Sequence, residues 1–406
     1  MPETAGGTVR LRALSVVREG DEVVVGDPES GTFVTMPAVG GVVIDALRRG
    51  ATLAEAAAGA EEFAGEPVDV PAFVTTLGEL GFLDDGEDRS PRPTAPVQGR
   101  RWLAGVRPET ARRFFGPAAW ACYVLCAAGA VAVPALRPAL RPDPAADALV
   151  FTDTGLSGLL LLPLALLAVA GHEAGHWLAA RAVGVRSRFG VDRRMVVLVV
   201  ETDLTQLWTV ERRLRYGPLL AGLAVDAVQL AAALVARLLV DTGHWSPPTT
   251  VDELLAAWVL IKTGQMLYQC MVFLRTDLYA VLVNALGCRD LWRVKSLLLR
   301  RAFGRLTPRQ TAELAAADPV DVRAGRWFRW VWLAGFAGVA AWFVLLVLPA
   351  LAEVARWTAD GLAEGPLDGA FWYRAACAVL LSAPVALPAA LAAREAATAL
   401  RSRRRP

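Results

Sequence analysis

The stretch LLLLPLALLAVAGHEAGH, residues 159–176, joins an apolar run that begins at Leu156 to the motif H-E-x-x-H. On a helix, His172 and His176 are one turn apart, so both imidazoles project from one face and can bind the same zinc ion. Glu173 then stands beside the metal as a general base. The alternative is a chance alignment of polar residues, but His and Glu inside a membrane helix are costly and usually functional.

The composition is that of a membrane protein. The 406 residues are 55% hydrophobic, and the mean hydropathy is +0.40, which is too apolar for an ordinary soluble enzyme. The net charge of +2 indicates no nucleic-acid partner. We therefore expect an α-helical polytopic protein of about six transmembrane helices, with the lipid bilayer as a partner. The predicted spans are residues 115–135, 156–179, 217–240, 253–274, 327–351 and 371–393.

Charge in the loops predicts the orientation of these spans. Arginines gather at alternate ends, whereas Asp and Glu occupy the opposite loops, with a few exceptions such as Arg137 and Arg374. Because cytoplasmic loops carry the excess of basic residues, we expect a multi-pass protein of the cell membrane with both termini in the cytoplasm. The first twelve residues lack an apolar core, which predicts no cleavable signal peptide. The five cysteines are scattered, so we expect no disulfide framework and no cysteine-based metal site.

Residues 10–85 predict a small α+β domain with a winged-helix-like arrangement. Two β-prone runs, 22–25 and 32–35, flank a turn that contains Pro and Gly, so a β-hairpin is expected. Three short helices follow, and a capping box of Thr52 and Glu55 starts the second. The predicted helices cover about residues 42–49, 53–63 and 71–80.

The runs EVVVGDPESGTFVTM (22–36) and VIDALRRGATLAE (43–55) resemble the PqqD-like peptide-recognition domains that accompany ribosomally made, modified peptides. The resemblance covers about residues 15–85. It implies that a leader peptide adds to the sheet edge as an extra strand. The alternative is a folded cap that regulates or stabilises the membrane part. Residues 86–114 read as a linker containing Pro and Arg, and residues 115–400 as the membrane domain.

A catalytic zinc site needs a third protein ligand and an open position for water. His244 is a candidate by residue type, but it lies in a predicted external loop and is expected to be a surface histidine. Asp277, in the stretch FLRTDLY (273–279), is the better candidate. A rise of about 1.5 Å per residue places it at the end of the fourth span, near the cytoplasmic boundary like His172. The alternative is a solvated carboxylate at a helix end.

Residues 155–300 resemble the site-2-protease family of intramembrane zinc metalloproteases, on the H-E-x-x-H motif and on Asp277, and are similar to its peptide-processing branch. The resemblance implies zinc bound by His172, His176 and Asp277, with Glu173 as the catalytic residue. One departure is Leu278, where family members commonly have Gly. The segments 216–218 and 221–222 resemble the family's small-residue segment, which close helix packing explains equally well.

Two further features complete the membrane part. The runs 195–200 and 207–210 flank residues 201–203 and predict a second hairpin near the cytoplasmic face, able to present substrate as an added strand. Asp226 and Lys262 fall near the middle of the bilayer, where a structural ion pair is expected. The alternative is a role in proton or water traffic.

Together these features predict a zinc metalloendopeptidase that hydrolyses a peptide bond in a ribosomally made precursor recruited by the N-terminal domain. One alternative is a non-hydrolytic membrane peptide receptor or export partner, which Leu278 slightly favours. Another is regulated cleavage of a membrane-bound signalling protein, such as an anti-sigma factor. The N-terminal domain argues against the latter, because such family members more often carry PDZ or CBS modules.

Overall fold

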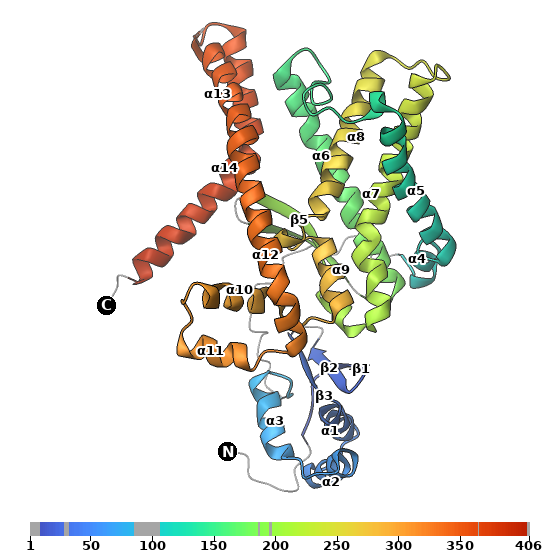
Figure 1. Cartoon of the computed structure of the whole chain (residues 1–406), viewed down its shortest axis with the longest axis vertical. Helices are drawn as coiled ribbons and strands as arrows, with labels where there is room; N and C mark the ends of the chain where they lie inside the picture. The colour runs from blue at the N-terminus through green and yellow to red at the C-terminus, as the bar shows by residue number, and fades with distance from the viewer. Residues whose placement is uncertain are drawn as a thin grey trace. The chain divides into compact units, whose positions relative to one another are not determined.

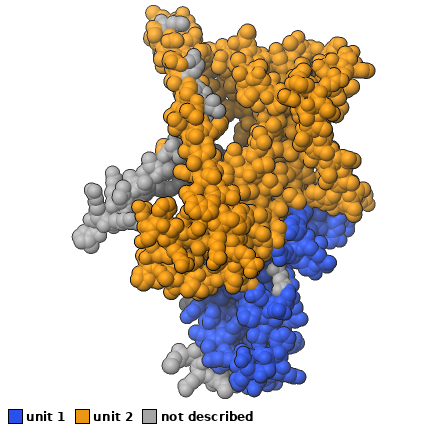
Figure 2. Space-filling view, in the orientation of Figure 1, with its two compact units in different colours: residues 1–112, 179–190, 202–217 blue, residues 113–178, 191–201, 218–406 orange. Residues whose placement is uncertain are grey.

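The computed structural model describes residues 9–27, 32–84, 106–185, 187–194, 197–363 and 365–403. The chain divides into two compact units, coloured separately in Figure 2. The predicted turn residues 28–31 and most of the predicted linker, residues 86–105, lie outside the described residues. Unit 1 comprises Met1–Arg112, Ala179–Gly190 and Thr202–Gly217, and unit 2 comprises the rest of the chain.

Unit 1 contains a three-stranded antiparallel sheet in the order β1-β2-β3. β2 and β3 form the predicted hairpin and pair along their whole length. Val23 and Val25 of the central strand are buried in one core with Ile44 and Leu77, as alternate residues of a strand face the same side. The sequence does not predict β1, because polar residues at both of its ends interrupt the apolar pattern. The strands are β1 (Ser15–Glu19), β2 (Glu22–Asp27) and β3 (Thr32–Pro37).

Three helices accompany this sheet. The predicted capping box is confirmed: the N–H of Glu55 donates to Oγ1 of Thr52 at 3.3 Å, and the Glu55 carboxylate accepts from the N–H of Thr52 at 2.8 Å. The first helix begins earlier than predicted. Gly40 and Gly41 conceal its start in the sequence, because glycine is a poor helix former. In the structure both glycines pack against side chains of the strands. The helices are α1 (Ala38–Arg48), α2 (Leu53–Ala64) and α3 (Val70–Glu79).

Four long helices lie side by side in Figure 1. Ala130 of α5, Leu234 of α7 and Val259 of α8 are buried in one apolar cluster. Small residues bring α6 against α7: a Cβ atom on Gly175 would lie 2.8 Å from the carbonyl oxygen of Ala221. The helices are α5 (Pro117–Leu136), α6 (Thr154–Ala182), α7 (Arg212–Asp241) and α8 (Thr249–Gln269).

Shorter helices and a long C-terminal group make up the rest. α10 packs on α12, and Leu291, Ala324 and Phe328 are buried in the cluster between them. The short elements are α4 (Pro108–Arg113), η1 (Pro138–Leu140), η2 (Thr205–Thr209), η3 (Val272–Leu274), α9 (Asp277–Leu286), α10 (Leu291–Ala302) and α11 (Pro308–Ala315). The C-terminal group is α12 (Pro319–Trp342), the π-helical η4 (Phe343–Val347), α13 (Leu348–Ala363) and α14 (Gly369–Arg403).

Within the described residues, four helices are long and apolar enough to cross a membrane, in agreement with a helical membrane protein. They correspond to four of the six predicted spans. α8 lies where the fourth span is predicted, but it carries Asp252, Glu253 and Lys262 within 21 residues. The sixth falls in α14, whose apolar stretch is the shorter Gly369–Ala383. The four helices are Pro117–Leu136, Thr154–Ala182, Arg212–Asp241 and Pro319–Leu345.

The predicted course of the fourth span to residue 274 and beyond is wrong, because α8 ends at Gln269 and Asp277 begins a separate helix, α9. Tertiary contacts override the apolar sequence here. The ring of Phe273 packs against Gly335 of α12, where an added Cβ atom would stand only 2.3 Å from the ring. Arg275 adopts a left-handed conformation, with φ 61° and ψ 43°, and so turns the chain.

The predicted second hairpin exists with different strands. β4 (Arg188–Arg194) and β5 (Val197–Asp203) form a two-stranded sheet. The predicted second strand, residues 207–210, is wrong, because it belongs mostly to the 3-10 turn η2. Residues 201–203, predicted as the turn, continue β5 instead. β-propensity depends strongly on context, and the basic residues of β4 conceal it in the sequence.

Candidate metal centre

The H-E-x-x-H motif lies on α6, as predicted, with both histidines on one face. His172 is 2% exposed and His176 is 3% exposed, whereas Glu173 is half-buried. One ligand atom from each of the three residues lies within 4.8 Å of the others, an arrangement that can hold a metal ion. The two rings meet edge to face, with centroids 4.8 Å apart.

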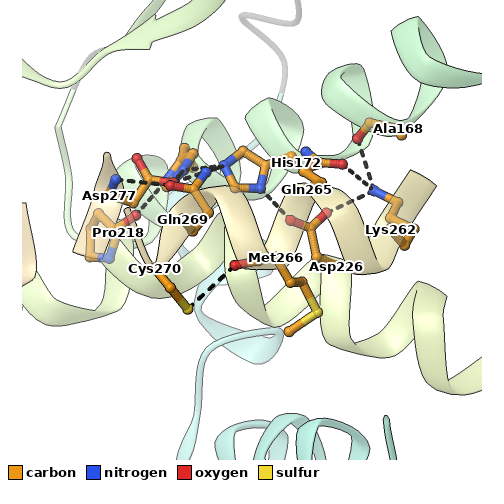
Figure 3. A network of polar contacts seen from close by, with 11 residues as sticks. Ala168, His172, Pro218, Asp226, Lys262, Gln265, Met266, Gln269, Cys270 and Asp277 are labelled. Carbon is orange, nitrogen blue, oxygen red and sulfur yellow. Dashed lines mark hydrogen bonds and ion pairs between the residues drawn. The ribbon is translucent and has the colours of Figure 1, made fainter. Parts of the chain in front are cut away.

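Asp277 joins this group from the first residue of α9 (Figure 3). Its Oδ2 atom lies 2.8 Å from Nε2 of His172 and 3.0 Å from Nε2 of His176, and the two nitrogens are 3.1 Å apart. The structure therefore brings together the three predicted ligands. His244 is exposed in the loop after α7, where its Nδ1 lies 2.9 Å from Oγ1 of Thr242.

The spacing of the three donor atoms fits a small metal ion. Tetrahedral zinc binds His nitrogen at about 2.0–2.1 Å, which separates neighbouring donors by about 3.3 Å. The donor atoms of His172, His176 and Asp277 are 2.8–3.1 Å apart, so a small outward shift of the side chains accommodates the ion. Gly222 of α7 faces the same nitrogen atoms, and its missing side chain leaves the space open.

Hydrogen bonds to the far side of the rings determine which nitrogen faces the site. Nδ1 of His176 lies 2.7 Å from the backbone oxygen of Pro218. A carbonyl oxygen only accepts, so Nδ1 carries the hydrogen and Nε2 of the neutral ring presents a lone pair. Nδ1 of His172 lies 2.6 Å from Oδ2 of Asp226 and is held in the same way. Two lone pairs and a carboxylate oxygen therefore converge, and a cation between them would relieve their repulsion.

Gln269 positions Asp277, the third predicted ligand. Its side-chain oxygen accepts the backbone N–H of Asp277 at 3.0 Å, and its Nε2 lies 3.2 Å from Nε2 of His172. Oγ1 of Thr276 donates to the backbone oxygen of Gln269 at 2.7 Å. Gln269 and Thr276 are both buried. These bonds tie the start of α9 to the end of α8, which places the Asp277 carboxylate against α6.

The predicted ion pair of Asp226 and Lys262 is confirmed, with Oδ1 and Nζ 2.7 Å apart. Asp226, which the sequence places near the middle of the bilayer, also contacts His172, which it places near the cytoplasmic boundary: Oδ2 and Nδ1 are 2.6 Å apart. A buried carboxylate in an apolar span is the signal that could have indicated a second partner.

Comparison of the chain with protein-family models, curated proteins and solved structures finds no match. The function proposed below therefore rests on the geometry of the site.

Proposed function

We propose that this protein is a membrane-embedded zinc metalloendopeptidase. The observation that supports it is the convergence of Nε2 of His172, Nε2 of His176 and Oδ2 of Asp277, at separations of 2.8–3.1 Å. Two histidines and one carboxylate are the ligand set of several catalytic zinc sites, which keep the fourth position for water or substrate. Glu173 lies beside that set, as the base of a metalloprotease does.

Each residue then has a defined task. His172, His176 and Asp277 would hold zinc, which would supply a Lewis acid able to polarise a carbonyl and to lower the pKa of water to about 7. Glu173 takes a proton from the attacking water and delivers it to the leaving amine. The amide nitrogen of Gln269, 3.2 Å from Nε2 of His172, can donate to the carbonyl oxygen as negative charge develops.

The proposed substrate is a ribosomally made precursor peptide, recruited through its leader. The sheet β1-β2-β3 of unit 1 has two outer strands, β1 and β3, and main-chain hydrogen bonds to such an edge provide affinity. The ribbon β4-β5 is proposed to hold the scissile segment extended, because a helical peptide bond is inaccessible to attack. The proposed location is the cell membrane, with both termini in the cytoplasm.

Co-expression with candidate precursor peptides tests the proposal. Mass spectrometry of the peptides, with the wild type and with Glu173→Ala, reads cleavage, and elemental analysis of the purified protein reads zinc. We expect Glu173→Ala to abolish cleavage and to keep stoichiometric zinc, because Glu173 acts on the proton and is not a ligand. Glu62→Ala, at an exposed residue of α2, is the control and should cleave normally. Processing by Glu173→Ala would show that this mechanism is wrong.

A further inference from the structure

Asp226 divides its carboxylate between two partners, as Figure 3 shows. Oδ1 accepts a hydrogen bond from Nζ of Lys262 at 2.7 Å, and Oδ2 lies 2.6 Å from Nδ1 of His172. Asp226 and Lys262 are both 0% exposed, so water does not compete for either contact. Lys262, Asp226 and His172 therefore form one continuous series that joins α8, α7 and α6.

Lys262 is itself held in place by the helix that carries the histidines. Besides Asp226, its Nζ donates to the backbone oxygen of Ala168 at 2.9 Å and to Oε1 of Gln265 at 3.3 Å. An ammonium has three N–H donors, and these three acceptors match them. Ala168 lies one turn before His172 on α6, so the position of Lys262 is set relative to that histidine.

We propose that Asp226 and Lys262 are positioning residues that prepare His172 to bind a metal ion. Asp226 accepts the Nδ1–H of the ring, which leaves the lone pair on Nε2 and directs it toward His176 and Asp277. Lys262 balances the charge of the buried carboxylate and holds it in place. This inference rests on the metal site of the proposed function, and it gives the ion pair a role in metal affinity beyond joining α7 to α8.

The two histidines differ in what supports their Nδ1 atoms, and this difference limits how much the loss of Asp226 can weaken metal binding. His176 is supported by the backbone oxygen of Pro218, which no substitution removes, whereas the support of His172 is a side chain. Loss of Asp226 therefore disturbs one ligand and leaves the other two in place. Removal of such a hydrogen-bond partner typically weakens metal binding about 10- to 100-fold, without abolishing it.

The experiment uses the full chain purified in detergent. Asp226→Asn or Lys262→Met alone leaves a buried group without its partner and is expected to impair folding. The decisive variant is therefore the double substitution Asp226→Leu/Lys262→Met, which removes both charges and fills the space with apolar atoms. Chelator competition measures zinc affinity, and the visible spectrum of the cobalt-loaded chain reports ligand geometry. The control is Arg237→Met/Asp252→Leu, which removes another ion pair between the same two helices, with Nε and Oδ1 3.5 Å apart.

We expect the double variant to keep its helix content, to bind zinc about 10- to 100-fold more weakly than wild type, and to show an altered cobalt spectrum. The control pair should retain wild-type affinity and spectrum. Wild-type affinity in the Asp226→Leu/Lys262→Met variant would overturn the inference, and so would a wild-type chain that binds no zinc. Tight zinc binding that depends on Asp226, in a chain that cleaves no peptide, would support the inference and overturn the proposed function alone.

Discussion

Gly222 of α7 approaches His172 so closely that a Cβ atom at this position would stand 2.5 Å from Nε2 of the ring. The same Cβ would be 2.5 Å from Nε2 of His176. Real Cβ atoms do not approach other atoms this closely, so any side chain at this position would displace both ligand nitrogens. The candidate metal site therefore depends on a residue that provides no ligand atom.

The first prediction is that Gly222→Ala loses high-affinity zinc binding and keeps its helical fold. The methyl group occupies the space of the ligand nitrogens, whereas alanine within a helix is favoured over glycine by roughly 0.5–1 kcal/mol. Zinc content and circular dichroism of the purified protein measure the two effects. Gly217→Ala in the same helix is the matched control, because nothing lies within 4 Å of its added Cβ. Stoichiometric zinc in Gly222→Ala would contradict the prediction.

Arg275 is the only residue other than glycine with a positive φ among the described residues. The left-handed conformation costs such a residue about 1–2 kcal/mol. Its guanidinium lies 5.5 Å from the ring centroid of Trp292, and both Arg275→Gly and Arg275→Ala lose this contact. Only the glycine variant also relieves the strain, so we expect it to be about 1 kcal/mol more stable than the alanine variant.

Thermal unfolding of the two variants in detergent measures this difference. The same pair of substitutions at Leu274, where φ is not positive, provides the control. There the order should reverse, because glycine loses more backbone freedom on folding than alanine. The same order at both positions would show that backbone strain at Arg275 is not the cause.

The environment of Lys295 is expected to make the stability of the protein depend on pH. Its Nζ lies 3.7 Å from the ring centroid of Trp292 and 4.3 Å from that of Trp332. Burial, together with the nearby charge of Arg275, lowers the pKa of Lys295 from 10.5 to about 8. Between these two values the unfolded chain binds more protons than the folded chain, so stability rises as the pH rises through this interval.

We expect the free energy of unfolding of the wild type to increase between about pH 8 and pH 10, by at most about 3 kcal/mol. Lys295→Met should lack this increase, because it has no proton to release there. Chemical denaturation of both proteins in detergent at several pH values is the measurement. Identical pH slopes for the two proteins would exclude Lys295 as the source.

Local sequence patterns predicted those parts of the fold that short-range chemistry determines. The pairing of β2 with β3 follows from two β-prone runs around a turn, and the start of α2 follows from Thr52 and Glu55. The spacing of His172 and His176 likewise places both rings on one face whatever the rest of the chain does. Asp277 was found by combining residue type with its predicted depth, and the structure brings it to the histidines.

Contacts between distant segments could not be predicted in the same way. The end of α8 at Gln269 depends on the close fit of Phe273 to Gly335 and on the side-chain bonds of Gln269, which no local pattern records. The bond between Asp226 and His172 joins residues 54 positions apart. Helix boundaries read from sequence are uncertain by about 2–4 residues, so helix rise places a residue in depth only to within about one turn.

The break between α8 and α9 has a consequence for the metal-free chain. Asp277 belongs to a short helix of its own, tied to α8 by the bonds of Gln269 and Thr276. A metal ion held by α6 and α9 would therefore act as a cross-link between two segments about one hundred residues apart, and its binding energy would become folding energy. Chelation would remove this cross-link as well as the Lewis acid. Residues 270–286 would then be the first part of the site to exchange their amide hydrogens with solvent.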